Sequence, residues 1–94
     1  MFVKFELTTN RVGCDSTQVY KVADESTSNY LDEIGNDLAR DNAEMYGIID
    51  EAREEAEEAG FDFEESECYG YSYEILEGMT EEEIVEEYGD YEVI

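Results

Sequence analysis

Apolar residues change their spacing twice along this chain, and that change restricts the fold more than any other feature of the sequence. They alternate with polar residues over positions 2–8, recur at every third or fourth position between 31 and 59, and alternate again over 67–77. Alternation is typical of a strand with one buried face, and the wider spacing is typical of an amphipathic helix. A chain with both patterns is expected to be an α+β protein in which helices pack on a sheet.

Three segments are predicted to be strands. Residues 2–8 form the first strand and residues 18–22 the second, with a loop over 9–15 between them. Two strands joined by a short loop pair antiparallel, so these segments are expected to form a hairpin. Residues 67–77 form the third strand and join the same sheet.

The central part of the chain predicts helices. Residues 41–42 interrupt the apolar stripe and Gly47 follows, which predicts either one kinked helix or two helices over roughly 28–45 and 48–59. Gly60 is placed to end the second helix, because glycine adopts the left-handed conformation that closes a helix C-terminus.

The last third of the chain adds one short helix. Thr80 and Glu83 have the spacing of a capping box, which predicts a helix that starts there. Residues 91–94 either add an edge strand or dock against the domain. The prediction is therefore a single α+β domain over residues 1–94. It has a small antiparallel three-stranded sheet, made of the N-terminal hairpin and the late strand, with helices packed on one face.

The composition excludes several classes of function. The chain has 28 Asp and Glu against 5 Lys and Arg, a formal net charge of −23, and no His. Without His there is no Ser-His-Asp or Cys-His relay and no His-ligated metal. With so few cations, direct binding to nucleic acid is not expected, because that affinity comes from cations that neutralise phosphates. No apolar run is long enough to span a membrane, and the alternating N-terminus does not resemble a signal peptide.

Catalysis, metals and cofactors are not expected either. Paired carboxylates can hydrolyse glycosides, but no pair stands out among so many, and no catalytic residue is assigned. No segment has the spacing of a calcium-binding loop. Cys14 and Cys68 are too few for a zinc site and are expected to be free thiols, although a disulfide between them stays open.

The negative charge is concentrated in the second half of the chain. Residues 1–47 carry a net charge of −5 and residues 48–94 a net charge of −18. Six carboxylates fall within the nine residues 50–58, which is roughly one charge per 2.2 Å of helix axis. Double-stranded DNA carries one per about 1.7 Å. The carboxylates further along could extend this field over more of one side of the protein.

These acidic residues, with two tyrosines among them, form the predicted partner-binding site. Tyr88 and Tyr91 could contact an arginine of a partner by cation–π interaction. The tyrosines of the third strand (Tyr69, Tyr71 and Tyr73) are expected to pack under the helices, and the alternative is an exposed row at a binding or dimer interface. The candidate residues are Asp50, Glu51, Glu54, Glu55, Glu57, Glu58, Glu81, Glu82, Glu86, Glu87, Tyr88, Asp90 and Tyr91.

The segment Thr8-Thr9-Asn10-Arg11-Val12-Gly13-Cys14 lies between the two N-terminal strands. This arrangement, followed by an acidic helix, resembles a family of short acidic bacteriophage proteins of unknown function over roughly the first 45 residues. Those proteins commonly have Gly where this chain has Asn10, a replacement expected to be tolerated at a turn position with positive φ. The resemblance implies a phage origin and transfers no active residue.

The resulting hypothesis is a phage DNA mimic. The chain would bind a basic nucleic-acid-binding protein of the host, such as a nuclease or another defence complex, and block its groove as an anti-restriction or anti-CRISPR inhibitor. It would act in the host cytoplasm as a monomer or homodimer. The alternative is a non-catalytic phage interaction or assembly module whose acidity serves only solubility, since charge runs are usually solvated faces.

Overall fold

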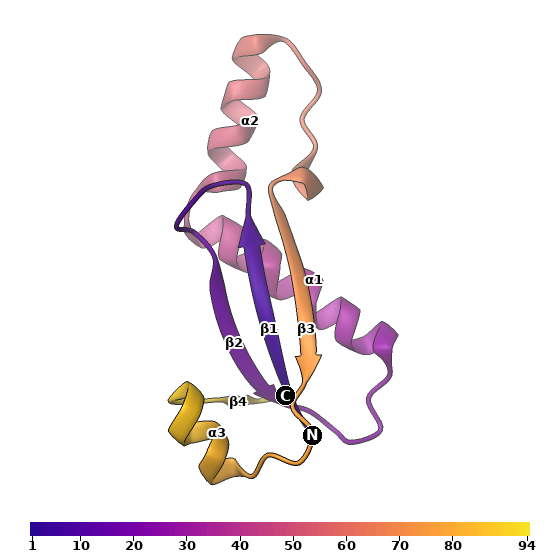
Figure 1. Cartoon of the computed structure of the whole chain (residues 1–94). Coiled ribbons are helices and arrows are strands. Elements are labelled where there is room, and N and C mark those ends of the chain that lie inside the picture. The colour runs from indigo at the N-terminus through magenta and orange to yellow at the C-terminus, as the bar shows by residue number, and fades with distance from the viewer.

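The computed structural model describes all residues, 1–94, and shows an elongated α+β protein measuring 51 × 26 × 16 Å along its principal axes (Figure 1). The strands form one mixed sheet in the order β3-β1-β2-β4. No helix has both the length and the apolar character needed to cross a membrane. The elements are β1 (Phe2–Thr9), β2 (Ser16–Lys21), α1 (Ser28–Met45), α2 (Ile48–Ala59), a 3₁₀ turn η1 (Glu65–Glu67), β3 (Tyr69–Ile75), α3 (Glu81–Tyr88) and β4 (Glu92–Val93).

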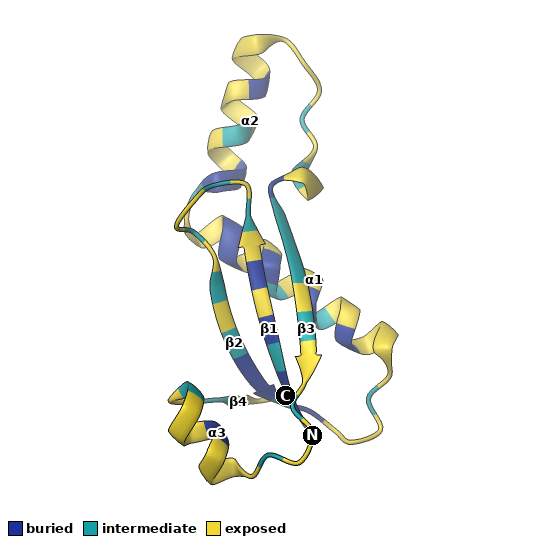
Figure 2. Cartoon of the chain, in the orientation of Figure 1, coloured by how far each residue is buried: buried dark blue, intermediate teal, exposed yellow.

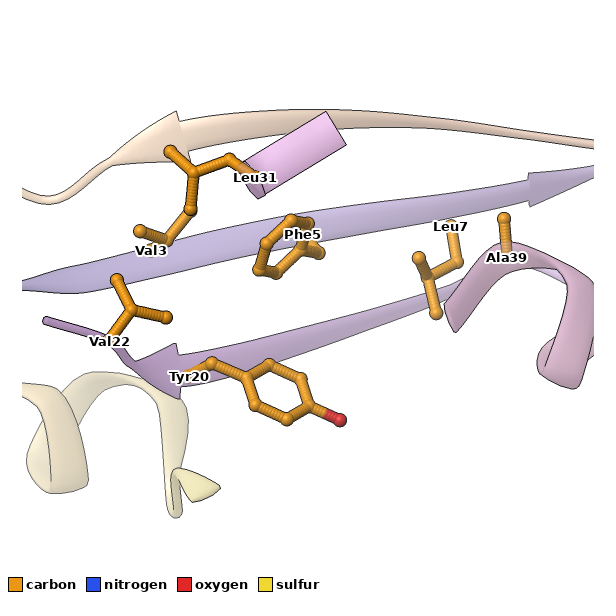
Figure 3. Close-up of a cluster of buried hydrophobic side chains, with 7 residues drawn as sticks. All are labelled: Val3, Phe5, Leu7, Tyr20, Val22, Leu31 and Ala39. Atoms are coloured by element: carbon orange, nitrogen blue, oxygen red, sulfur yellow. The ribbon is translucent and has the colours of Figure 1, made fainter. Parts of the chain in front are cut away.

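The main core lies between the sheet and α1. The central strand β1 pairs antiparallel with both β2 and β3, so its residues Val3, Phe5 and Leu7 are fully buried under α1. Tyr20, Val22, Leu31 and Ala39 complete this cluster, which Figure 3 shows between the strands and the helix. The alternation that predicted the first strand therefore identifies its buried face correctly.

The two predicted long helices are confirmed at the expected bounds. Thr27 caps α1 by accepting a hydrogen bond from the Tyr30 backbone N–H at 3.2 Å. The two helices are separated at Gly47, which has φ 71°. The second helix, α2, ends at Gly60, which has φ 76° and donates its N–H to the Ala56 carbonyl. The break lies at the glycine and not at the polar pair before it.

Asn42 is part of the interior and not a gap in the apolar stripe. It is only 4% exposed, and its amide nitrogen donates to the Cys14 carbonyl at 2.9 Å. Its amide oxygen accepts from the Ser16 hydroxyl at 3.1 Å. A buried amide with both groups hydrogen-bonded fixes the end of α1 against the hairpin loop.

The hairpin loop differs from the sequence expectation at Asn10. No residue other than glycine has positive φ, so Asn10 does not take the left-handed turn conformation. Instead its backbone N–H donates to the Cys68 carbonyl at 3.1 Å, which ties the loop to the start of β3. The turn is held by Thr9, whose hydroxyl donates to the Arg11 carbonyl and accepts from the Arg11 N–H.

The tyrosines of β3 pack against α1, as predicted. Tyr69, Tyr71 and Tyr73 are half-buried beside the main core. Tyr71 lies directly over Gly35 of α1, and its hydroxyl donates to the Asp32 carboxylate at 3.1 Å. The strand is shorter than predicted, because the residues before Tyr69 form η1.

The α+β class and the antiparallel pairing of the hairpin with β3 are confirmed. The predicted three-stranded sheet with its helices on one face is corrected in two respects, the first of which is the edge-strand alternative for residues 91–94. The C-terminal residues form β4, a fourth strand parallel to β2. In addition, α3 does not share the face that α1 covers. Its residue Ile84 is buried against Phe2 and Val19, which alternation places on the opposite face of the sheet.

Candidate functional site

The helix α2 projects beyond the end of the sheet at the hairpin side of the molecule (Figure 1). Ile48, Ile49 and Ala56 are buried and anchor it, whereas most of its surface faces solvent (Figure 2). All six carboxylates predicted on this helix are exposed. We refer to them as the α2 carboxylates: Asp50, Glu51, Glu54, Glu55, Glu57 and Glu58.

Half of the α2 carboxylates contact a cation of the same chain. Arg11 of the hairpin loop reaches across to Glu51 at 2.6 Å and to Glu55 at 3.4 Å. Arg53 pairs with Asp50 at 3.3 Å. The other three, Glu54, Glu57 and Glu58, make no ion pair and are available to a partner. No local pattern predicts that the distant Arg11 reaches α2, because that contact depends on the path of the loop.

The second acidic group lies at the other end of the molecule, on and after α3. We call it the C-terminal carboxylates: Glu81, Glu82, Glu86, Glu87 and Asp90. Only Glu81 is ion-paired, with Lys21 at 2.7 Å. Hydrogen bonding to Lys21 and its positive charge hold the pKa of Glu81 below its usual range. Asp90 accepts a hydrogen bond from the Tyr91 N–H, and the remaining three are exposed and unpaired.

Tyr88 and Tyr91 pack against the interior of the protein and remain partly exposed to solvent. Both are half-buried beside the small cluster of Phe2, Val19 and Ile84. The Tyr91 ring packs edge-on against Phe2, with 5.0 Å between ring centroids and an interplanar angle of 83°. The sequence did not indicate that Tyr91 would pack on Phe2, because the two residues lie near opposite ends of the chain.

The two acidic groups do not lie side by side on one surface. The structure brings together the residues within each group but places α2 and α3 at opposite ends of the long axis (Figure 1). The carboxylates of the two groups therefore do not form one acidic surface along a single side, as the sequence suggested. The molecule is elongated and carries one acidic group at each end.

Every cationic side chain of the chain is used internally. Besides the three already described, Lys4 pairs with Glu6 and Glu74 at 3.5 and 3.3 Å. Arg40 pairs with Glu44 at 3.4 Å and with Glu65 at 2.7 Å. No cationic side chain is left without a carboxylate partner, so the surface carries a large excess of negative charge.

A groove of about 490 Å³ lies between β2 and the C-terminal segment. We call it the edge groove. The β2 side is formed by residues 17–20, and the other side by residues 87–88 and 90–92. Tyr20 is 8% exposed, and its hydroxyl donates to the Gln18 side chain at 2.8 Å. Burial, followed by the charge of Glu92, raises the pKa of Tyr20 to about 12. Its hydroxyl therefore stays protonated well into the alkaline range.

The thiols and carboxylates do not form a metal centre. No group of three or more Cys, Asp or Glu side chains converges closely enough to hold a metal ion. Cys14 and Cys68 belong to one small cluster with Ala43, Ile48 and Ile49, and both are free thiols. Burial raises the pKa of the Cys68 thiol, which makes it less reactive than an exposed cysteine.

Comparison with known proteins finds no matching family model, no similar curated protein and no similar solved structure.

Proposed function

We propose that this protein binds a basic nucleic-acid-binding protein and occupies its groove, with carboxylates in the places where phosphates would lie. The observation that supports this proposal is the distribution of charge along an elongated molecule. A net charge of −23 over a long axis of 51 Å is about one negative charge per 2.2 Å. The corresponding value for double-stranded DNA is about 1.7 Å, so the two linear charge densities are similar.

The magnitude of the charge argues for a use beyond solubility. A net charge of about 2–8 keeps a small domain soluble, and additional like charge destabilises the compact state. The resemblance of the hairpin region to short acidic phage proteins implies a phage origin, and the target that we propose is a defence nuclease or another nucleic-acid-binding complex of the host. The competing function is a phage assembly module that binds through its sheet or an apolar edge.

A competition experiment separates these two functions. The tagged protein is used to capture proteins from bacterial lysate, with and without excess double-stranded DNA. The mimic function predicts capture of a nucleic-acid-binding protein that DNA displaces, with affinity that falls steeply as salt rises. A captured protein that ignores DNA and salt would instead support the assembly module, and the absence of any captured protein would overturn both.

The structure identifies the variant that tests α2 most cleanly. Reversal of Glu51 and Glu55 would place lysines against Arg11 and disturb the loop as well as the surface. The triple change Glu54→Gln, Glu57→Gln and Glu58→Gln removes only unpaired charges. The mimic function predicts weaker capture by this variant.

A matched control has the same change in net charge. The triple change Glu33→Gln, Asp37→Asn and Asp41→Asn removes three exposed, unpaired carboxylates from α1. If α2 is a contact surface, the α2 variant loses more affinity than this control. Equal losses from the two variants would show that only the overall field matters and that α2 is not in the interface.

A further inference from the structure

The edge groove is bordered by a strand edge that is only partly covered. β4 pairs with β2 at Tyr20 and Lys21, through Glu92 and Val93, and then ends. Val22 exchanges backbone hydrogen bonds with Met1, so its N–H and C=O groups point toward β1. Backbone groups alternate in direction along a strand, so those of Lys21, Val19 and Thr17 point away from β1, toward the open edge of the sheet. The outward N–H groups of Thr17 and Val19 lie beyond the pairing with β4.

The opposite wall of the groove contains tyrosine rings next to carboxylates that have no ion-pair partner. Tyr88 and Tyr91 line it together with the carboxylates of Glu87, Asp90 and Glu92. None of these three carboxylates has a cationic partner in this chain, whereas the nearby Glu81 is already paired with Lys21. Aromatic rings beside carboxylates are the surroundings that bind a guanidinium or ammonium group, by cation–π attraction and ion pairing together.

We propose that the edge groove binds an extended basic segment of the partner protein, which adds to the free edge of β2 and places an arginine or lysine among the tyrosines. Backbone pairing to a free strand edge supplies affinity, and a side-chain pocket beside the edge supplies specificity. The volume of about 490 Å³ is within the range of sites that hold a side chain or small ligand. The inference rests on the proposed function for the partner's basic character, and it adds a defined contact to what overall charge would provide.

The first test uses a short peptide in which arginine alternates with threonine. A control peptide carries citrulline, which has nearly the shape of arginine without its charge. The protein is labelled with 3-fluorotyrosine and followed by ¹⁹F NMR, and backbone amide exchange is measured in parallel. The arginine peptide is expected to shift the resonances of Tyr20, Tyr88 and Tyr91 and to slow exchange of the Thr17 and Val19 amides, whereas the citrulline peptide should do neither.

A pair of charge-matched variants separates the groove from the overall field. The groove variant carries Glu87→Gln, Asp90→Asn and Glu92→Gln. Its control carries Glu25→Gln, Glu33→Gln and Asp37→Asn, which removes the same number of exposed, unpaired carboxylates from outside both the groove and α2. The groove variant is expected to bind the arginine peptide about tenfold more weakly than the control. Equal weakening in both variants, or slowed amide exchange concentrated on α2, would overturn the inference.

Failure of the proposed function and failure of the groove inference give different results. Failure of DNA to displace a captured protein counts against the mimic function, even where the peptide binds the groove. A captured protein that DNA displaces, but that binds the groove variant as tightly as it binds this charge-matched control, retains the mimic function and overturns the groove inference.

Discussion

The close approach of Gly35 in α1 to Tyr71 in β3 predicts that a normally stabilising substitution destabilises this protein. Gly35 is buried in the middle of α1, where Ala would ordinarily improve helix stability by about 1 kcal/mol. A Cβ atom at this position would lie 2.5 Å from Cδ2, 2.8 Å from Cε2 and 3.0 Å from Cγ of Tyr71. Cγ moves only if Tyr71 changes its χ1 rotamer or the backbone moves, so the ring must leave its packed position, or the strand or the helix must shift. Overpacking of this kind costs about 1–3 kcal/mol, and a contact this short belongs at the upper end.

The expected net effect of Gly35→Ala is a loss of about 2 kcal/mol in the free energy of unfolding. For a domain of this size, that corresponds to a fall of roughly 8–16 °C in Tm. Urea unfolding at constant salt measures the loss, and the same substitution in a Tyr71→Ala background is the control. Without the ring, Gly35→Ala should stabilise by up to about 1 kcal/mol. If Gly35→Ala stabilises the protein while Tyr71 is present, the ring does not pack on α1 as closely as described.

Four further outcomes are expected. The Asn42→Ala variant leaves the Cys14 carbonyl unpaired and should lose about 1–3 kcal/mol in urea unfolding, whereas the exposed change Asn36→Ala should have little effect. Because folding raises the pKa of Tyr20 from 10.0 to about 12, its contribution to stability is complete below pH 10 and is lost as pH rises toward 12. The alkaline decline should therefore be smaller in Tyr20→Phe, and an unchanged decline would assign it to other groups. Arg11→Gln should speed amide exchange in α2 more than in β1, and uniform acceleration would contradict a local role. Moderate salt should raise Tm, because it screens the repulsion among unpaired carboxylates, and a fall in Tm would contradict this.

The sequence predicts the local elements well because each is specified by nearby residues. The spacing of apolar side chains, the glycines at 47 and 60 and the Thr80 cap identify all three helices. The parallel pairing of β4 with β2 and the placement of α3 on the second face are different in kind. The first depends on pairing of Tyr20 and Lys21 with residues 92–93, and the second on packing of Ile84 against Phe2 and Val19. These are contacts between residues far apart in the chain, and no local pattern encodes them.

The candidate site is less predictable for a related reason. The sequence identifies which residues are acidic, and the structure shows all of the predicted carboxylates exposed. It does not reveal which of them are neutralised, since the ion pairs of Glu51, Glu55 and Glu81 are made with Arg11 and Lys21 from the hairpin. The edge groove could not be predicted either, because it exists only where β4 stops short of the full length of β2.

Four of the five cationic side chains join different elements of this highly charged chain by ion pairs, and the fifth, Arg53, pairs within α2. Arg11 joins the hairpin loop to α2, Lys21 joins β2 to α3, Arg40 joins α1 to η1, and Lys4 joins β1 to β3. Each of these pairs therefore links two elements that would otherwise meet as acidic surfaces. Paired groups at contact distance are also screened less by salt than the separated like charges are. The same arrangement leaves Glu54, Glu57 and Glu58 at one end, and the unpaired carboxylates of the edge groove at the other, without internal partners. The charges that could meet a basic partner are thus distinct from the charges that hold the elements together, and substitutions can test binding without removing the ion pairs between elements.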